Sequence, residues 1–227
     1  MKLTPKEKSK VVRCCNEKLI SDYNFDIDKH YPVEWFKSLF SFVGNDKLQE
    51  HLGDEFFQAR FLSCLMETLS LPMGKNKGVV KFQIIQYASI CEALLNYAID
   101  TYYKDEFESE FAATVYSEAK DAFSSLTHIT HNGHPLYVCR AKKEKAKTAF
   151  TSTPVKADYA LSKGIISQDI RDEYCALYDL RNNTHILKAA AIDYYPKIKE
   201  SKDAYILTYR FVNEIKNYFE THIKGMP

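Results

Sequence analysis

The stretch LYDLRNNTHI, Leu177 to Ile186, places Arg181, Asn182 and His185 directly after an apolar helical pattern. An imidazole titrates near pH 6.5, so His185 could accept or donate a proton at neutral pH. Arginine stays charged and can hold two phosphate oxygens at once, while the Asn182 amide can position a phosphate oxygen or the imidazole. These groups could therefore form a small catalytic pair that acts on a phosphate.

Helical spacing puts Arg181 and His185, four residues apart, on one helix face within about 80° of the preceding apolar positions. Those positions are Ile170, Tyr174 and Leu177. These apolar positions form a seam along one face of the helix. An arginine on this seam must be paired, because an unpaired buried charge is costly. The alternatives are that both residues are core side chains held by partners, or that the helix ends at Asn182–Asn183 and the two share no face.

The pattern around this stretch is helical along most of the chain. Seven glycines and seven prolines are too few for a turn-rich sheet protein. Asn45 or Asp46 and Ser167 are typical N-caps, and Gly164 is expected to end a helix. Helices are predicted at about 1–22, 32–43, 47–71, 79–103, 106–126, 159–163, 167–191 and 202–223. We therefore predict an all-α protein.

The segment 79–103 is predicted to be the central helix, because it is apolar around most of its circumference. Its polar residues Ser89, Glu92, Asn96 and Asp100 form one narrow stripe on the helix. This stripe either faces a functional cleft or simply faces solvent.

LRNNTH, together with the earlier helix QYASICEALLNYAI and its single acidic residue, resembles the HEPN superfamily. The resemblance covers about residues 79–223. It implies an all-α helical bundle, commonly a homodimer, and in many members metal-independent endoribonuclease activity in phage defence, toxin–antitoxin systems or stress response. It also implies that Arg181, Asn182 and His185 are catalytic and that Glu92 supports them. In such a site the RNA 2′-hydroxyl would attack the adjacent phosphate without a metal, and the products would be a 2′,3′-cyclic phosphate and a 5′-hydroxyl. Three residues separate Arg181 from His185, where the family usually has four to six.

Residues 127–153 are predicted to be a long loop with a short basic helix. The run RAKKEKAK supplies positive charge that could follow a phosphate backbone, and the alternative is a solvated charge run. Its basic residues are Arg140, Lys142, Lys143, Lys145 and Lys147. His128, His131 and His134 recur every three residues and could bind zinc, although the spacing matches no established zinc pattern.

Composition narrows the function classes further. Lys+Arg 31 against Asp+Glu 30 gives no basic field for tight non-specific nucleic-acid binding. The six cysteines form no C-x-x-C, and no signal peptide or membrane-spanning stretch is evident, so we expect a cytoplasmic protein without membrane association. No phosphate-loop, G-x-S-x-G or H-E-x-x-H motif occurs, so no cofactor is expected.

The sequence therefore predicts an N-terminal helical extension at residues 1–75 and a HEPN-like helical domain at residues 76–227. The first functional hypothesis is a homodimeric, metal-independent endoribonuclease with RNA as its substrate and a protein antitoxin or regulator as a further partner. The second is a non-catalytic module that uses the same cleft to bind RNA, a nucleotide or a partner protein. The seam position and the two asparagines favour the first hypothesis, and the short Arg–His spacing and neutral charge favour the second.

Overall fold

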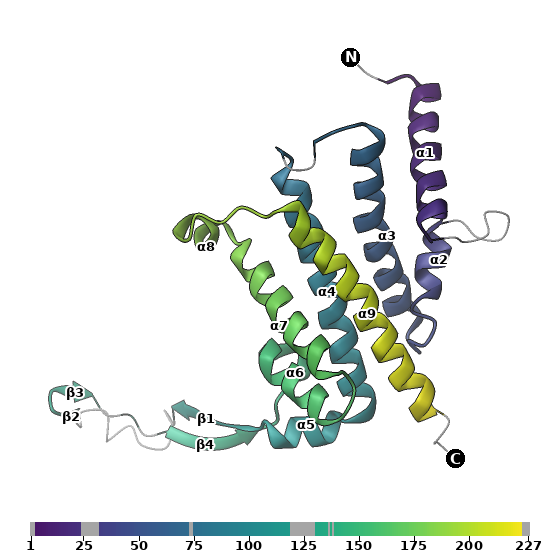
Figure 1. Cartoon of the computed structure of the whole chain (residues 1–227). Coiled ribbons are helices and arrows are strands. Elements are labelled where there is room, and N and C mark those ends of the chain that lie inside the picture. Colours follow the sequence, from purple (N-terminus) through teal and green to yellow (C-terminus); the bar gives the residue numbers. More distant parts are fainter. Residues whose placement is uncertain are drawn as a thin grey trace. The chain divides into compact units, whose positions relative to one another are not determined.

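The computed structural model of the chain describes residues 3–23, 32–72, 75–118, 130–135, 137 and 139–223. The chain divides into two compact units, one formed by residues 1–97 with 153–227 and the other by residues 98–152. Most of the described chain is helical (Figure 1), which confirms the predicted helical class. No helix among these residues is long and apolar enough to cross a membrane.

The first unit is built from helices that come from both ends of the sequence. Before the second unit the chain forms α1 (Pro5–Tyr23), α2 (Pro32–Ser38), α3 (Asp46–Thr68) and α4 (Lys77–Tyr102), of which α4 belongs to this unit as far as Tyr97. After it come α6 (Thr153–Ser162), α7 (Gln168–Asn183), α8 (Ile186–Ala191) and α9 (Ile198–Ile223). The first 75 residues therefore share a compact unit with the helices that carry the LRNNTH stretch.

Helix α4 lies at the centre of this unit, as its apolar sequence predicts. Gln83 is fully buried and donates hydrogen bonds to the Ser63 hydroxyl of α3, while the Ser201 hydroxyl of α9 donates to the Gln83 carbonyl oxygen. Further along α4, the Cys91 thiol donates to the Thr208 hydroxyl of α9 at 3.6 Å. Helices α3 and α9 therefore contact α4 through these residues. The side chains of Glu92 and Asn96, also on α4, contact residues of α6 and α7 instead.

The ends of the helices follow local capping chemistry. The Asn45 side chain accepts a hydrogen bond from the backbone N–H of Leu48 at the start of α3, and Ser167 caps α7 in the same way, so both predicted N-caps are confirmed. Gly164 follows α6 with a φ of 67°, a left-handed conformation that glycine adopts without steric cost. The predicted stop at Gly164 is confirmed as well.

The helix predicted at 167–191 is wrong beyond Asn183. Helix α7 ends there, Thr184 is its C-cap, and a separate short helix, α8, begins after His185. The Thr184 hydroxyl donates to the Arg181 carbonyl oxygen at 2.6 Å, and the Thr184 N–H donates to the same oxygen at 3.1 Å. These local bonds, after two asparagines that are weak helix formers, end the helix two residues before His185.

The second unit corrects the predicted helix at 106–126 as far as Glu118, and the predicted loop and basic helix at 127–153 where the chain is described. Residues 119–129, 136 and 138 lie outside the described residues. Helix α5 (Lys104–Glu110) is short, and β1 (Ala113–Glu118) pairs antiparallel with β4 (Cys139–Glu144). Two further strands, β2 (Thr130–His131) and β3 (His134–Pro135), form a tight hairpin, and a 3-10 turn, η3 (Thr148–Phe150), follows β4. The β-branched and aromatic residues of TVYS favour a strand, and the pairing partner lies too far along the chain for local periodicity to reveal it.

Candidate functional site

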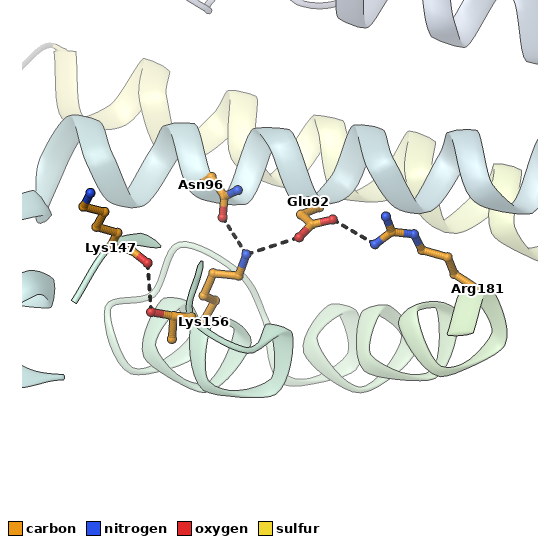
Figure 2. A network of polar contacts seen from close by, with 6 residues as sticks. Glu92, Asn96, Lys147, Lys156 and Arg181 are labelled. Carbon is orange, nitrogen blue, oxygen red and sulfur yellow. Dashed lines mark hydrogen bonds and ion pairs between the residues drawn. The ribbon is translucent and has the colours of Figure 1, made fainter. Parts of the chain in front are cut away.

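Glu92 is the centre of a polar network that joins α4, α6 and α7 in the first unit (Figure 2). Its Oε2 accepts a hydrogen bond from Arg181 Nη1 at 3.0 Å, and its Oε1 lies 3.5 Å from Lys156 Nζ. The same ammonium donates to Asn96 Oδ1, one helical turn further along α4, at 2.8 Å. One carboxylate therefore holds two cations that come from two other helices.

The members of this network differ in their access to solvent. The Lys156 side chain is fully buried, at 0% exposure, whereas Arg181 keeps 29% and Glu92 keeps 26% of their side-chain surface. A buried ammonium is tolerated only where charge and hydrogen bonds compensate its lost hydration, and here Glu92 and Asn96 do so. Lys156 is thus suited to a supporting role, while the outward part of Arg181 can meet an arriving anion.

Two buried hydroxyls lie on the inner parts of the same helices. Tyr174 of α7 is fully buried and Thr153 of α6 is 1% exposed. Burial raises the pKa of Tyr174 well above its ordinary value, and the negative charges available to Cys91 and Glu92 add to that shift. Tyr174 is therefore a neutral phenol across the physiological range and does not act as a base.

His185 does not share a helix face with Arg181, which corrects the seam prediction. It is the N-cap residue of α8, with an extended backbone (φ −64°, ψ 132°), and its side chain is exposed. Its backbone N–H donates to the Asn182 carbonyl oxygen at 3.3 Å, and no side chain in the described ranges forms a hydrogen bond with its ring. The alternative that α7 ends at Asn182–Asn183 is the correct one.

Among the residues predicted for the site, the structure therefore pairs Arg181 with Glu92 directly. Asn182 is half-buried in the last turn of α7, and His185 stands free in the turn that follows. This arrangement combines an anchored cation, which can bind phosphate, with an accessible imidazole, which can transfer protons. The two are close in sequence, and the backbone turn at Thr184 sets their orientation.

Lys156 was not predicted from the sequence, although its position carried a signal. Within TPVKADYALS the buried residues of α6 include Thr153, Lys156, Ala157 and Ala160, a helical i, i+3, i+4, i+7 pattern. A lysine on an apolar seam needs a partner for the same reason as Arg181 does. Lys156 could therefore have been singled out from the sequence in the same way as Arg181.

The basic run of the second unit lies on an exposed strand and the segment after it. All of its cationic residues are exposed: Arg140, Lys142, Lys143, Lys145 and Lys147. Side chains alternate along a strand, so Arg140 and Lys142 lie on one face of β4 and Lys143 on the other. Local carboxylates offset part of this charge, since Lys145 lies 3.5 Å from Glu108 and Lys142 lies 3.5 Å from Glu144.

The histidines considered as zinc ligands are only partly within the described structure. His131 and His134 are exposed cross-strand partners in the β2–β3 hairpin, and His128 lies outside the described residues. Among the residues that the structure does describe, no group of three His, Cys, Asp or Glu side chains could hold a metal ion. All six cysteines carry free thiols.

No protein-family model, curated protein or solved structure matches the chain. The geometry of the Glu92 network and of the His185 turn is therefore the basis for a functional assignment.

Proposed function

We propose that the chain is a metal-independent endoribonuclease of HEPN type, with Arg181 and His185 as its catalytic residues. The observation that carries the proposal is that His185 is exposed in the turn that follows an arginine anchored to a carboxylate, four residues after it in the chain. A catalytic imidazole must be accessible to substrate, and His185 is exposed in a turn. A catalytic arginine must be held in place, and the bond to Glu92 does so while 29% of the side chain stays open.

The reaction follows from these groups. His185 removes the proton from an RNA 2′-hydroxyl, and the oxygen attacks the adjacent phosphorus. The bond from phosphorus to the 5′-oxygen breaks, and a protonated histidine supplies the proton that this leaving oxygen needs. Arg181 binds the non-bridging oxygens, where negative charge increases in the transition state. Asn182 positions a phosphate oxygen beside them.

We extend the proposal to a homodimer, because one histidine cannot be base and acid in the same step. Two apolar side chains follow His185 directly, and both are strongly exposed, Ile186 at 78% and Leu187 at 87%. Exposed apolar side chains of this size favour a protein contact. A second copy seated there would bring a second His185 to the same phosphate, and a protein antitoxin or regulator could cover the same surface.

The experiment is cleavage of labelled single-stranded and structured RNA in EDTA by the wild type, His185→Ala and His51→Ala. His51 is an exposed histidine of α3 and controls for the loss of an imidazole elsewhere. The proposal expects cleavage in EDTA, cyclic-phosphate ends, at least a hundredfold loss in His185→Ala, consistent with the usual gain from general acid–base catalysis, and no loss in His51→Ala. Equal cleavage by His185→Ala and the wild type would refute it.

A non-catalytic binding module is the second candidate. The short interval between Arg181 and His185, and the helix end between them, favour it, because they separate the two groups onto different elements. This candidate predicts that the folded wild-type protein binds RNA and leaves it intact in EDTA. It also predicts that Arg181→Gln weakens RNA binding while His185→Ala has little effect.

A further inference from the structure

A cavity of about 340 Å³ borders the turn that carries His185. Thr184 and Ile186, the two neighbours of His185 in the chain, both contribute to its wall. The remainder of the wall comes from the first turns of α4, from α8, and from residues 193–196 between α8 and α9. All of these segments belong to the first unit. Its volume lies within the range of small-ligand sites.

The charged groups of this cavity favour an anion. Lys77 and Lys81 lie one helical turn apart on α4, and Asp193 is the carboxylate of the wall. No ion pair joins either lysine to a carboxylate within the described residues. Two uncompensated ammonium groups against one carboxylate leave the cavity with positive charge, which favours a phosphate group.

The aromatic and apolar groups favour a flat ring beside that phosphate. Tyr195 is 56% exposed, and Lys77 Nζ lies 3.4 Å from the centre of its ring, a close cation–π contact. Ile186, Ala189 and Pro196 supply apolar wall next to it. Aromatic rings beside cations are the usual means by which proteins bind bases of single-stranded nucleic acid without a sequence code.

We infer that this cavity binds one nucleotide of a single-stranded RNA, with its phosphate at Lys77 and Lys81 and its base on Tyr195. The inference rests on the proposed function, because it adds a substrate subsite to the His185 turn. Thr184 and Ile186 line the cavity, and His185 lies between them in the chain. An RNA strand bound in the cavity therefore passes close to His185. The subsite therefore sets which phosphate of the strand reaches the catalytic pair.

The test is the affinity of the full chain for a fluorescent 2′-O-methyl RNA octamer, followed by anisotropy at several salt concentrations. This probe lacks the attacking hydroxyl, so binding is measured without cleavage. The variants are Lys77→Gln/Lys81→Gln and Tyr195→Leu. The matched control is Lys8→Gln/Lys10→Gln, which removes two exposed charges from α1. Thermal melts confirm that all variants fold.

Lys77→Gln/Lys81→Gln should weaken binding at least tenfold and lower the slope of log affinity against log salt by about 0.7, the value for the one phosphate that both lysines bind. Tyr195→Leu should weaken binding roughly tenfold with no change in that slope, because stacking is not ionic. The control should change neither value. Equal effects of the cavity pair and the control pair, or no octamer binding by the wild type, would overturn the subsite.

Two further measurements distinguish this inference from a free-nucleotide site and from failure of the proposed nuclease. Competition by 5′-AMP distinguishes a strand from a free nucleotide, and AMP that binds as tightly as the octamer would overturn the assignment to a strand. Cleavage of unmodified RNA is measured separately with His185→Ala. If that variant cleaves normally while the cavity variants lose octamer affinity, the proposed nuclease fails and the nucleotide site stands. If His185→Ala is inactive and the cavity variants bind normally, the subsite alone fails.

Discussion

The Glu92 carboxylate accepts a hydrogen bond from Arg181 at 3.0 Å with one oxygen and faces the buried Lys156 ammonium at 3.5 Å with the other. The two cations are not equivalent, because Lys156 is sealed from solvent and Arg181 is not. Lys156 also has a second acceptor, Asn96. The buried Lys156 ammonium therefore holds one oxygen of Glu92 in place, and the other oxygen of Glu92 holds the partly exposed Arg181.

Glu92→Gln should lower the free energy of unfolding by about 3 kcal/mol, because it leaves the buried Lys156 ammonium without its carboxylate. Lys156→Met should cost less, about 1 kcal/mol, since methionine fills a similar volume and Glu92 keeps Arg181. The double variant should be more stable than the sum of the two losses predicts. Urea unfolding of all three proteins measures this coupling, with exposed Glu220→Gln as the control. Additive losses would show that the two side chains do not interact.

Local chemistry predicted much of the helical framework. Asn45, Ser167 and Gly164 each act through their own side chain or backbone freedom, so their effects can be inferred from a few neighbouring residues. Residues 203–212, which resemble a strand in composition, are part of α9, as the helical pattern after them indicates. A continuous apolar periodicity outweighs the propensity of single residues.

The sequence predictions failed where the structure depends on a pairing partner far along the chain or on local hydrogen bonds at a helix end. The β1–β4 pairing joins residues more than twenty positions apart, such as Ala113 and Glu144, and no short-range pattern encodes it. The stop at Thr184 depends on its hydroxyl and its N–H, which both bond back to the Arg181 carbonyl oxygen, and on the two asparagines before it. This helix end removes His185 from the helix face that its spacing from Arg181 predicts.

Cys91 should make the stability of the protein fall at alkaline pH. Burial raises the pKa of the Cys91 thiol to about 12, whereas the unfolded chain loses that proton near its ordinary value of 9.0. The stabilising contribution is therefore complete below pH 9 and is lost as pH rises toward 12. Between these values the free energy of unfolding should fall by about 1.4 kcal/mol per pH unit from this group.

The measurement is urea unfolding at pH 9.0, 9.75 and 10.5 for the wild type and Cys91→Ala. The variant also removes a buried sulfur, which lowers stability equally at each pH, so only the difference in slope is informative. Thr208 keeps its hydrogen bond to the Ala204 carbonyl oxygen in the variant and adds no unpaired hydroxyl. Parallel pH dependences for the two proteins would contradict the prediction.

The exposed basic strand β4 should contribute to RNA affinity through charge alone. Arg140→Gln/Lys142→Gln/Lys143→Gln should weaken octamer binding and reduce its salt dependence by about 0.7 for each phosphate that these side chains bind in the wild type, without lowering the melting temperature. The matched control is Lys6→Gln/Lys8→Gln/Lys10→Gln on α1, where the lysines are equally exposed. The same change in both triple variants would mean that the run is a solvated surface and does not bind RNA.

The α8 surface should govern both oligomeric state and cleavage, if the nuclease acts as a homodimer. Leu187 is 87% exposed next to His185, so Leu187→Glu places a charge in the proposed contact without disturbing the core. We expect light scattering to show a dimer for the wild type and a monomer for Leu187→Glu, with cleavage reduced at least tenfold. Ile206→Glu changes an apolar side chain of α9 that is 53% exposed and should leave both properties unchanged. A monomeric wild type that cleaves RNA would show that one His185 is sufficient and that water supplies the second proton transfer.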